Sequence, residues 1–216
     1  VGYNALYTDT TGKNNTAVGG NSLLLNTTGA SNVAVGTSAL DANTTGARNV
    51  AIGFDSLGAN TTASNNTAVG NASLDANTTG TSNTALGRNA LGANTTASNN
   101  TAVGMNALLA NITGVNNTAV GVNALGSVLN DGNTAVGLSA GATITSGQYN
   151  TALGLVSMTA AVYTGNYNSS IGYNSRPNAA GASGQFTLGD ENISNLRCND
   201  QSISALSDSR DKTDVI

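Results

Sequence analysis

The sequence predicts an all-β solenoid, in which short parallel strands stack as successive coils of one chain. Glycines that follow an aliphatic residue recur about every 17 residues from Gly2 to Gly189, with one step of 16 and one of 18. Asn, Thr and Gly together supply 89 of the 216 residues, whereas only 8% of the residues are charged and Trp is absent. So regular a period in a chain with so few bulky side chains is typical of a repeat protein rather than of a compact globule.

The repeat contains two aliphatic columns. The residue before each glycine is predicted to be core, and a second apolar stripe lies four places after the glycine. Because side chains alternate along a strand, the Ala between the Thr and the aliphatic residue faces the other way, where another strand can approach closely. The first column comprises Val1, Val18, Val35, Ile52, Val69, Leu86, Val103, Val120, Val136, Leu153, Ile171 and Leu188. The second comprises Leu6, Leu23, Leu40, Leu57, Leu74, Leu91, Leu108 and Leu125, and then loosens to Gly141, Met158 and Arg176.

Asparagine also recurs in two columns, for which we predict a structural role. Stacked side-chain amides can form hydrogen bonds from coil to coil, which satisfies polar groups that would be costly to bury alone. The Thr-Thr-Gly or Thr-Thr-Ala after the second column is predicted to be a turn with room for a positive φ. The first column is Asn15, Asn32, Asn49, Asn66, Asn83, Asn100, Asn117, Asn133, Asn150 and Asn168, and the second is Asn26, Asn43, Asn60, Asn77, Asn94 and Asn111.

One chain of this kind is predicted to be a marginally stable rod. At about 4.8 Å between neighbouring strands, the stack from Gly2 to Gly189 would be roughly 50 Å long. Burying one Val and one Leu contributes about 3–6 kcal/mol for each coil, which is less than the backbone entropy lost by seventeen residues. We therefore expect several identical chains to merge an aliphatic column along a shared axis.

Composition excludes several classes of function. Seven basic and eleven acidic residues give a net charge of −4, so the positive surface that binds nucleic acid is not expected. No apolar run approaches the roughly 18 residues of a membrane span, and VGYNALYTDT does not resemble a signal peptide. There is no His and Cys198 is the only Cys, so we expect no zinc cluster, no disulfide framework and no cofactor. Four aspartates, Asp41, Asp55, Asp75 and Asp131, are too scattered in sequence for a calcium loop.

The core of the repeat, Asn-Thr-Ala-Val-Gly-x-x-Ala, resembles the head repeat of trimeric autotransporter adhesins and also parts of phage tail fibres. Residues 100–116, NTAVGMNALLANITGVN, show the pattern well. The adhesin repeat is shorter, so the extra residues here are expected to lengthen the loop around Asn-Thr-Thr-Gly. This resemblance implies a β-roll and a homotrimer.

The C-terminal residues 188–216, LGDENISNLRCNDQSISALSDSRDKTDVI, resemble the junction before the intramolecular chaperone of phage tail spikes, tail fibres and endosialidases. In that family a Ser-Asp-x-Arg-x-Lys motif marks self-cleavage after assembly. The resemblance makes Ser207 the nucleophile and Lys212 the base for a cut after Leu206. A neutral Lys can take the hydroxyl proton of a Ser without any His. Beyond this single-turnover step in the parent protein, no enzymatic activity is expected.

The combined hypothesis is a homotrimeric phage tail fibre segment that belongs to the virion, is made in the bacterial cytoplasm and attaches to the host. We predict regular solenoid repeats over 1–125, irregular repeats over 126–189, a junction over 190–206 and the start of the cleavable chaperone over 207–216. The irregular part holds exposed candidates for stacking on a bacterial surface glycan or contacting a protein receptor, although these rings could instead fill the core where the rod changes width. The candidates are Tyr149, Tyr163, Tyr167, Tyr173 and Arg176.

Two alternative functions remain open at this stage. A bacterial trimeric surface adhesin head would share the repeat but would need a membrane anchor in place of the chaperone. An ice-binding solenoid is suggested by Thr-Thr pairs such as Thr27 and Thr28. Adjacent threonines point to opposite faces of a strand, however, whereas a flat ice-binding array needs alternate positions.

Overall fold

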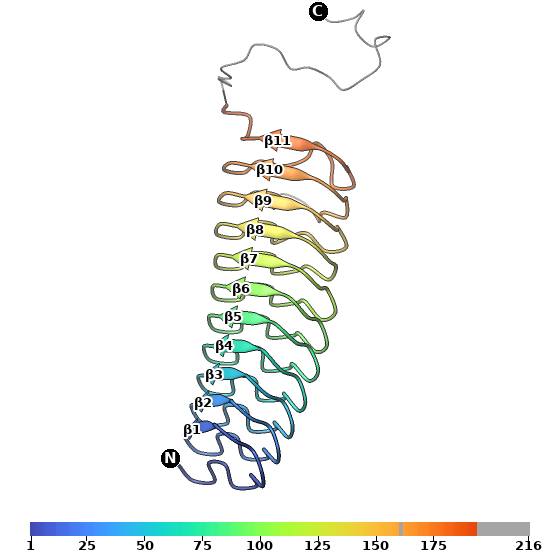
Figure 1. The fold of residues 1–216 in the computed structure, drawn as a ribbon. Coiled ribbons are helices and arrows are strands. Elements are labelled where there is room, and N and C mark those ends of the chain that lie inside the picture. The colour runs from blue at the N-terminus through green and yellow to red at the C-terminus, as the bar shows by residue number, and fades with distance from the viewer. Residues whose placement is uncertain (160–161, 194–216) are drawn as a thin grey trace, which may run out of the picture.

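The chain forms an elongated β-solenoid, as seen in a computed structural model that describes residues 1–159 and 162–193. Each coil contributes one three-residue strand, and the eleven strands form a single parallel sheet in sequence order (Figure 1). The predicted all-β solenoid is therefore confirmed. The strands are β1 (Thr16–Val18), β2 (Val33–Val35), β3 (Val50–Ile52), β4 (Thr67–Val69), β5 (Thr84–Leu86), β6 (Thr101–Val103), β7 (Thr118–Val120), β8 (Thr134–Val136), β9 (Thr151–Leu153), β10 (Ser169–Ile171) and β11 (Phe186–Leu188).

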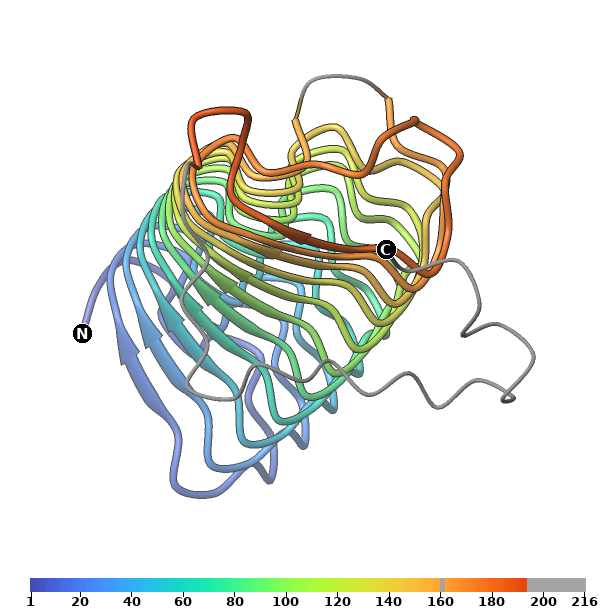
Figure 2. The ribbon, with the colours of Figure 1, turned by 90° about the horizontal axis from the view of Figure 1, so that it is seen from above.

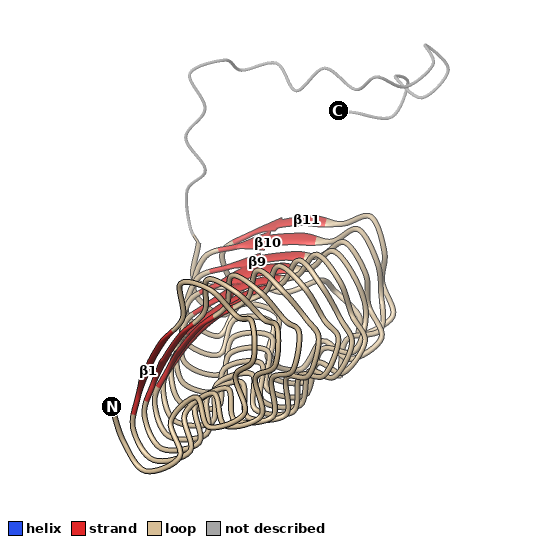
Figure 3. Cartoon of the chain, turned by 60° about the horizontal axis from the view of Figure 1, so that its bottom comes forward, coloured by secondary structure: helices blue, strands red, loops and turns tan. Residues whose placement is uncertain are grey.

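The sheet covers one side of the coil, and turns and bends complete the rest of it (Figures 2 and 3). Neighbouring strands pair in register, so that each residue lies beside its equivalent in the next repeat. Ala17 pairs with Ala34, for example, and Val18 pairs with Val35. The shorter step of 16 residues between β7 and β8 keeps this register, with Ala119 beside Ala135. Differences in repeat length are therefore absorbed outside the strands.

The interior of the coil is filled by alanine from the strand and leucine from the opposite wall. Leu23, Leu57 and Leu108 are fully buried, as are Ala34 and Ala68. The predicted second apolar stripe is confirmed. The alanine face packs against the leucines of the opposite wall, however, and not against another of the described strands. Because alternate strand residues point to opposite faces, burying the alanines turns the aliphatic residues before each glycine outward.

The prediction that the aliphatic residue before each glycine is core is wrong for the single chain. Leu86 in β5 is 47% exposed and Val18 in β1 is 43% exposed. The coil is thin, and the leucines opposite the sheet leave room for only a methyl group on the inner side of the strand. We call this outward column the sheet stripe. It comprises Val18, Val35, Ile52, Val69, Leu86, Val103, Val120, Val136, Leu153, Ile171 and Leu188.

The buried leucines adopt a left-handed backbone conformation, which is unusual for a large side chain. Leu57 has a φ of 51° and Leu91 a φ of 52°. Hydrogen bonds on both sides hold this conformation, since Leu57 N donates to Ser73 O and Leu57 O accepts from Asn60 N. Burial of the side chain and the two hydrogen bonds together offset a backbone strain of about 1–3 kcal/mol.

The turn after the second asparagine column differs from the prediction. Its glycine does not have a positive φ, which falls instead two residues later, at Ser31 and Arg48 for example. A Cβ on Gly46 would lie 2.3 Å from Asn43 Oδ1 and 2.4 Å from Ala63 O. Alanine nevertheless occupies the same turn position at Ala63 and Ala97, where its carbonyl accepts the same bond from the buried amide. The turn therefore accepts either of the two smallest residues.

Both asparagine columns form the predicted hydrogen-bonded ladders in the interior. In the second column, Asn43 Nδ2 donates to Asn26 Oδ1 at 2.8 Å and also to Gly46 O at 3.0 Å. The same pair of bonds recurs at Asn60, with Asn43 Oδ1 and Ala63 O as the acceptors. Each amide thus closes its own turn and binds the coil before it.

The first asparagine column uses the backbone as well as the side chain. Asn49 N donates to Asn32 Oδ1 at 2.9 Å, and Asn49 Nδ2 donates to Ala63 O at 2.9 Å. This ladder continues to Asn168, whose Oδ1 accepts from Gln185 N at 3.0 Å. Because these asparagines are buried, each depends on the next coil for its partners.

The second ladder ends where the repeat becomes irregular. Asn111 Oδ1 is buried without a hydrogen-bond partner among the described residues. In the following coils this column is occupied by Val128, Ile144 and Tyr163, all of them buried. Ile144 also compensates for Gly141 in the leucine column, because its Cδ1 lies 3.1 Å from where a Cβ of Gly141 would be. From about residue 126, the second column therefore holds apolar side chains in place of amides, while the first amide ladder continues.

The glycine after each strand is predicted to be intolerant of substitution. Gly87 has a φ of 136°, and its Cβ would lie 2.6 Å from both C and O of Gly104. Gly87→Ala should lower the free energy of unfolding by about 3 kcal/mol or more, because it combines backbone strain with overlap. Gly20→Ala is the control, since nothing lies within 4 Å of its Cβ. Chemical denaturation should show a change of less than about 1 kcal/mol for the control, and equal effects of the two variants would contradict the explanation.

A break within the second asparagine ladder should cost more than a change at its end. Asn60→Val leaves Asn43 Oδ1 without its donor and removes the acceptor of Asn77 Nδ2. Asn111→Val removes a 3.4 Å bond to Asn94 Oδ1 and a 2.9 Å bond to Gly114 O, the counterpart of the bond from Asn60 to Ala63 O, but it deprives no later amide of an acceptor because Asn111 Oδ1 is already unpartnered. We expect Asn60→Val to destabilise the fold by about 2 kcal/mol more than Asn111→Val in thermal or chemical unfolding. Equal losses would show that coil-to-coil amide bonding is not the decisive factor.

Candidate functional site

The most extensive candidate surface is the sheet stripe, which runs along the outer face of all eleven strands. Its residues are half-buried or exposed in every coil, and none is fully covered within the chain. Thr67, Thr84 and Thr101 lie on the same face, two residues before the stripe. The result is a narrow, uncharged and partly apolar face on the outer side of the sheet, whose strands are red in Figure 3.

A second exposed apolar column lies beside the sheet stripe in the later coils. Its residues follow the glycine, two places after the stripe, and we call it the flanking stripe. Leu138 is 50% exposed and Leu155 is 43% exposed. In the coils from β1 to β5 the same position holds Gly20, Thr37, Phe54, Asn71 and Arg88, of which only Phe54 is a large apolar residue. The flanking stripe comprises Met105, Val122, Leu138, Leu155 and Tyr173, so the apolar face is two residues wide from β6 to β10.

The five receptor candidates predicted from the sequence do not form one cluster. Tyr163 is only 3% exposed and occupies the apolar continuation of the second asparagine column. It pairs with Ile144 through a parallel bridge. Burial raises the pKa of the Tyr163 hydroxyl, while the positive charge of Arg176 acts in the opposite direction. Tyr163 therefore fills the core and does not present its ring to a ligand.

Tyr149 and Tyr167 lie on the surface, in the corner before β9 and β10. Their rings are stacked, with centroids 5.3 Å apart and planes inclined by 12°. Tyr149 is 50% exposed and Tyr167 is 65% exposed. Tyr173 is also exposed, but it belongs to the flanking stripe, after β10. Tyr149 and Tyr167 thus precede their strands, whereas Tyr173 follows its strand.

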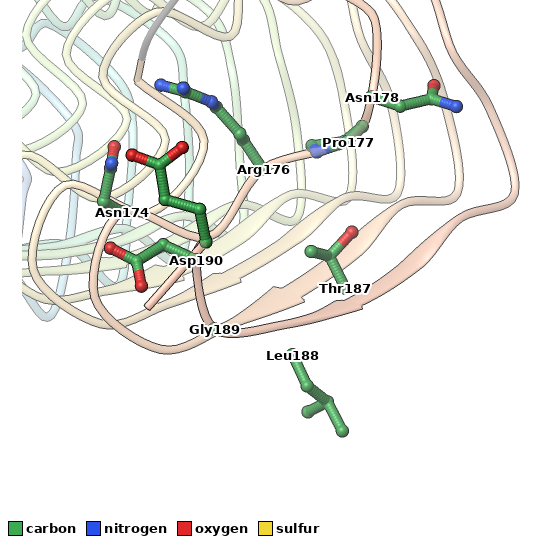
Figure 4. Close-up of a pocket in the computed structure, with 9 residues that line it drawn as sticks. Asn174, Arg176, Pro177, Asn178, Thr187, Leu188, Gly189 and Asp190 are labelled. Carbon is green, nitrogen blue, oxygen red and sulfur yellow. The ribbon is translucent and has the colours of Figure 1, made fainter. Parts of the chain in front are cut away.

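Arg176 belongs to a pocket at the C-terminal end of the stack. The pocket has a volume of about 370 Å³ and is lined by Asn174, Arg176, Pro177, Asn178, Thr187, Leu188, Gly189, Asp190 and Glu191. Figure 4 shows the side chains of Arg176 and Asp190 on the same side of the pocket, whereas the side chain of Leu188 points away from it. This separation follows from strand alternation in β11, which places Thr187 and Leu188 on opposite faces.

A group of three aspartates was not expected from the sequence. Asp41, Gly58 and Asp75 occupy equivalent positions in consecutive coils, and Asp55 approaches this column over the glycine. A Cβ on Gly58 would lie 2.3 Å from Asp55 Oδ1. Desolvation by burial is the main cause that raises the pKa of Asp41 and of Asp75, and the charge of Asp55 raises both pKa values further. The three carboxylates therefore repel one another when ionised.

Within residues 1–159 and 162–193, no group of three His, Cys, Asp or Glu side chains has the geometry to hold a metal ion. The same residues contain no helix long and apolar enough to cross a membrane. The predicted cleavage residues Ser207 and Lys212, together with Leu206 and Cys198, lie outside the described residues. Their roles remain predictions.

Comparison with protein-family models, with curated proteins and with solved structures finds no match for this chain. The candidate surfaces therefore rest on the chemistry and geometry of the chain itself.

The aspartate group predicts a pH-dependent contribution to stability. The pKa values of Asp41 and Asp75 are raised above 3.8 in the folded chain, so the folded state binds more protons than the unfolded state just above that pH. The contribution of the two carboxyls to the free energy of unfolding is therefore most favourable below pH 3.8. It is lost as the pH rises through the raised pKa values. Asp55→Asn should remove part of the repulsion and stabilise the chain at neutral pH by about 0.5 kcal/mol after solvent screening.

The control for this prediction is the same pair of proteins at about pH 3, below the raised pKa values of Asp41 and Asp75, where these two carboxyls are mostly uncharged. Thermal unfolding of the variant and the wild type should then differ less than at neutral pH. A stabilisation that stayed the same at both pH values would mean that charge repulsion is not its cause.

Proposed function

We propose that this chain is a structural and host-adhesion segment of a homotrimeric phage tail fibre. The observation that carries this proposal is the sheet stripe, an aliphatic residue that is half-buried or exposed on every strand of an otherwise well-packed solenoid. Two identical partners complete the apolar interior along the fibre axis. The number three comes from the resemblance of the Asn-Thr-Ala-Val-Gly repeat to trimeric adhesin heads and phage fibres.

The energetics favour association along the whole rod. Burying a large aliphatic side chain completely contributes about 1.5–3 kcal/mol. Seven of the eleven sheet-stripe residues are 36–47% exposed, and the other four are less exposed. Covering the stripe therefore contributes about 5–10 kcal/mol for each chain, and the flanking stripe adds to it. This is comparable with the cost of association, which is about 4–15 kcal/mol.

The rest of the proposal concerns assembly and attachment. The parent protein uses the chaperone junction that residues 188–216 resemble, and it is cut after Leu206 by Ser207 with Lys212 as the base. The mature fibre belongs to the virion, carries no cofactor and has no multiple-turnover activity. Its partners are two further copies of the chain and a glycan or protein on the bacterial surface. It does not bind nucleic acid or insert into a membrane.

Charges on the sheet stripe should dissociate the assembly. Leu86 and Leu153 are 47% and 43% exposed, and the double variant Leu86→Glu with Leu153→Glu places carboxylates on the contact face. Sedimentation should show three copies for the wild-type chain and one copy for the variant, because burying unpaired charges is costly.

The matched control is Ile112→Glu, which is equally exposed at 46% but lies in the turn after the second asparagine column. This variant should keep the mass of the wild type, and all three proteins should retain the circular dichroism of the solenoid. A monomeric wild-type chain, or a double variant that remains trimeric, would contradict the proposal.

A further inference from the structure

The stacked pair Tyr149 and Tyr167 is bounded by glycine on both sides along its column. The equivalent residue in the coil before Tyr149 is Gly132, and the equivalent residue in the coil after Tyr167 is Gly184. All four residues have a positive φ, so they share one type of corner. In earlier coils this column holds Asn, Ser or Arg, for example Asn99.

The two glycines differ in what surrounds them. A Cβ on Gly132 would lie 2.5 Å from Cδ1 of Tyr149, so the Tyr149 ring lies over this glycine. A Cβ on Gly184 would meet no atom of the described residues within 4 Å. Both rings therefore lean towards the N-terminal end of the rod. The described residues leave open the space beside Tyr167 that a side chain at residue 184 would fill. One face of the Tyr167 ring is covered by Tyr149, and the other face is available above Gly184.

The residues around this open face are polar and uncharged. Asn166 Oδ1 accepts from Gln148 N at 2.7 Å, and Ser183 Oγ accepts from Asn166 N at 2.9 Å. Asn166 Nδ2 has no hydrogen-bond partner among the described residues. The residues directly before Tyr167 and Gly184 therefore carry an amide and a hydroxyl group held in fixed positions.

We propose that the face of Tyr167 above Gly184 binds one pyranose ring of a neutral glycan. The C–H groups on the apolar face of a sugar ring carry partial positive charge and are attracted to the electron-rich face of an aromatic ring. The stack with Tyr149 holds Tyr167 in place, which reduces the entropy lost on binding. Uncharged amide and hydroxyl neighbours match the hydroxyl groups of a sugar, whereas an anionic ligand would need a cation here. This site gives a chemical class to the receptor contact, and its role in attachment rests on the proposed function.

The test measures the binding of two defined probes, cellotetraose and β-1,4-galactotetraose, to the 216-residue chain. Saturation-transfer NMR detects contact with the sugar protons, and the change in tyrosine fluorescence gives a titration, because the chain contains no Trp. We expect binding of at least one probe in the millimolar range. Tyr167→Ala should weaken it by about tenfold. Tyr7→Ala is the control and should bind like the wild type, since Tyr7 is 75% exposed, lies in the first coil and belongs to neither stripe.

A second variant blocks the site without altering either tyrosine. Gly184 has a φ of 71°, and Asn65 and Asn99 occupy the same column with φ values of 63° and 62°. Gly184→Asn therefore suits the backbone and places an amide in the open space above Tyr167. It should weaken binding about as much as Tyr167→Ala, with the unfolding temperature of the wild type.

The proposal is overturned if the wild-type chain binds neither probe, or if Tyr167→Ala and Gly184→Asn bind like the wild type. Sedimentation of the same samples separates this result from the proposed function. A chain that is monomeric but binds sugar through Tyr167 would retain this site and exclude the fibre assembly. A trimer that binds neither probe would exclude this sugar site and retain the fibre assembly.

Discussion

The hydrogen bond from one buried asparagine to the next coil is the interaction on which this structure depends. A coil of 17 residues encloses little more than a leucine and a few small side chains, so apolar burial alone cannot order it. Asn43 and Asn49 place polar groups in the interior, and these groups are satisfied only when the neighbouring coil is present. An isolated coil would therefore lack partners for its own core. This requirement makes folding cooperative along the rod.

The period and the composition of the columns were sufficient to predict the solenoid, the buried leucines and the amide ladders. They were not sufficient to predict which face of the strand is inside. Alternation groups Val103 with Thr101 and separates both from Ala102, but it does not say which group faces inward. The thickness of the coil decides this, because Leu91 and Leu108 leave space for only a methyl group between the walls. A larger aliphatic residue is therefore placed outside, although it is the more hydrophobic one.

Other features depended on contacts between coils that a single repeat does not reveal. A left-handed backbone at Leu57 contradicts the usual preference of leucine, and only its burial and its two backbone hydrogen bonds explain it. Tyr163 is a buried aromatic residue in a column that holds asparagine up to Asn111 and apolar residues from Val128 onward. The aspartates approach one another because Gly58 leaves space for Asp55. In each case the decisive neighbour lies about 17 residues away, or the decisive feature is a missing side chain.

The constant strand register has a further consequence for how such a rod could change during evolution. Because Ala34, Ala51 and Ala68 meet equivalent partners on both sides, each interior coil contacts its neighbours through nearly the same surface. Duplication or deletion of one complete repeat would reproduce these contacts at the new boundary and alter only the reach of the rod. A partial repeat would misalign the leucine and asparagine columns across the junction. Changes in length should therefore occur in units of one coil, independently of the sequence at either end.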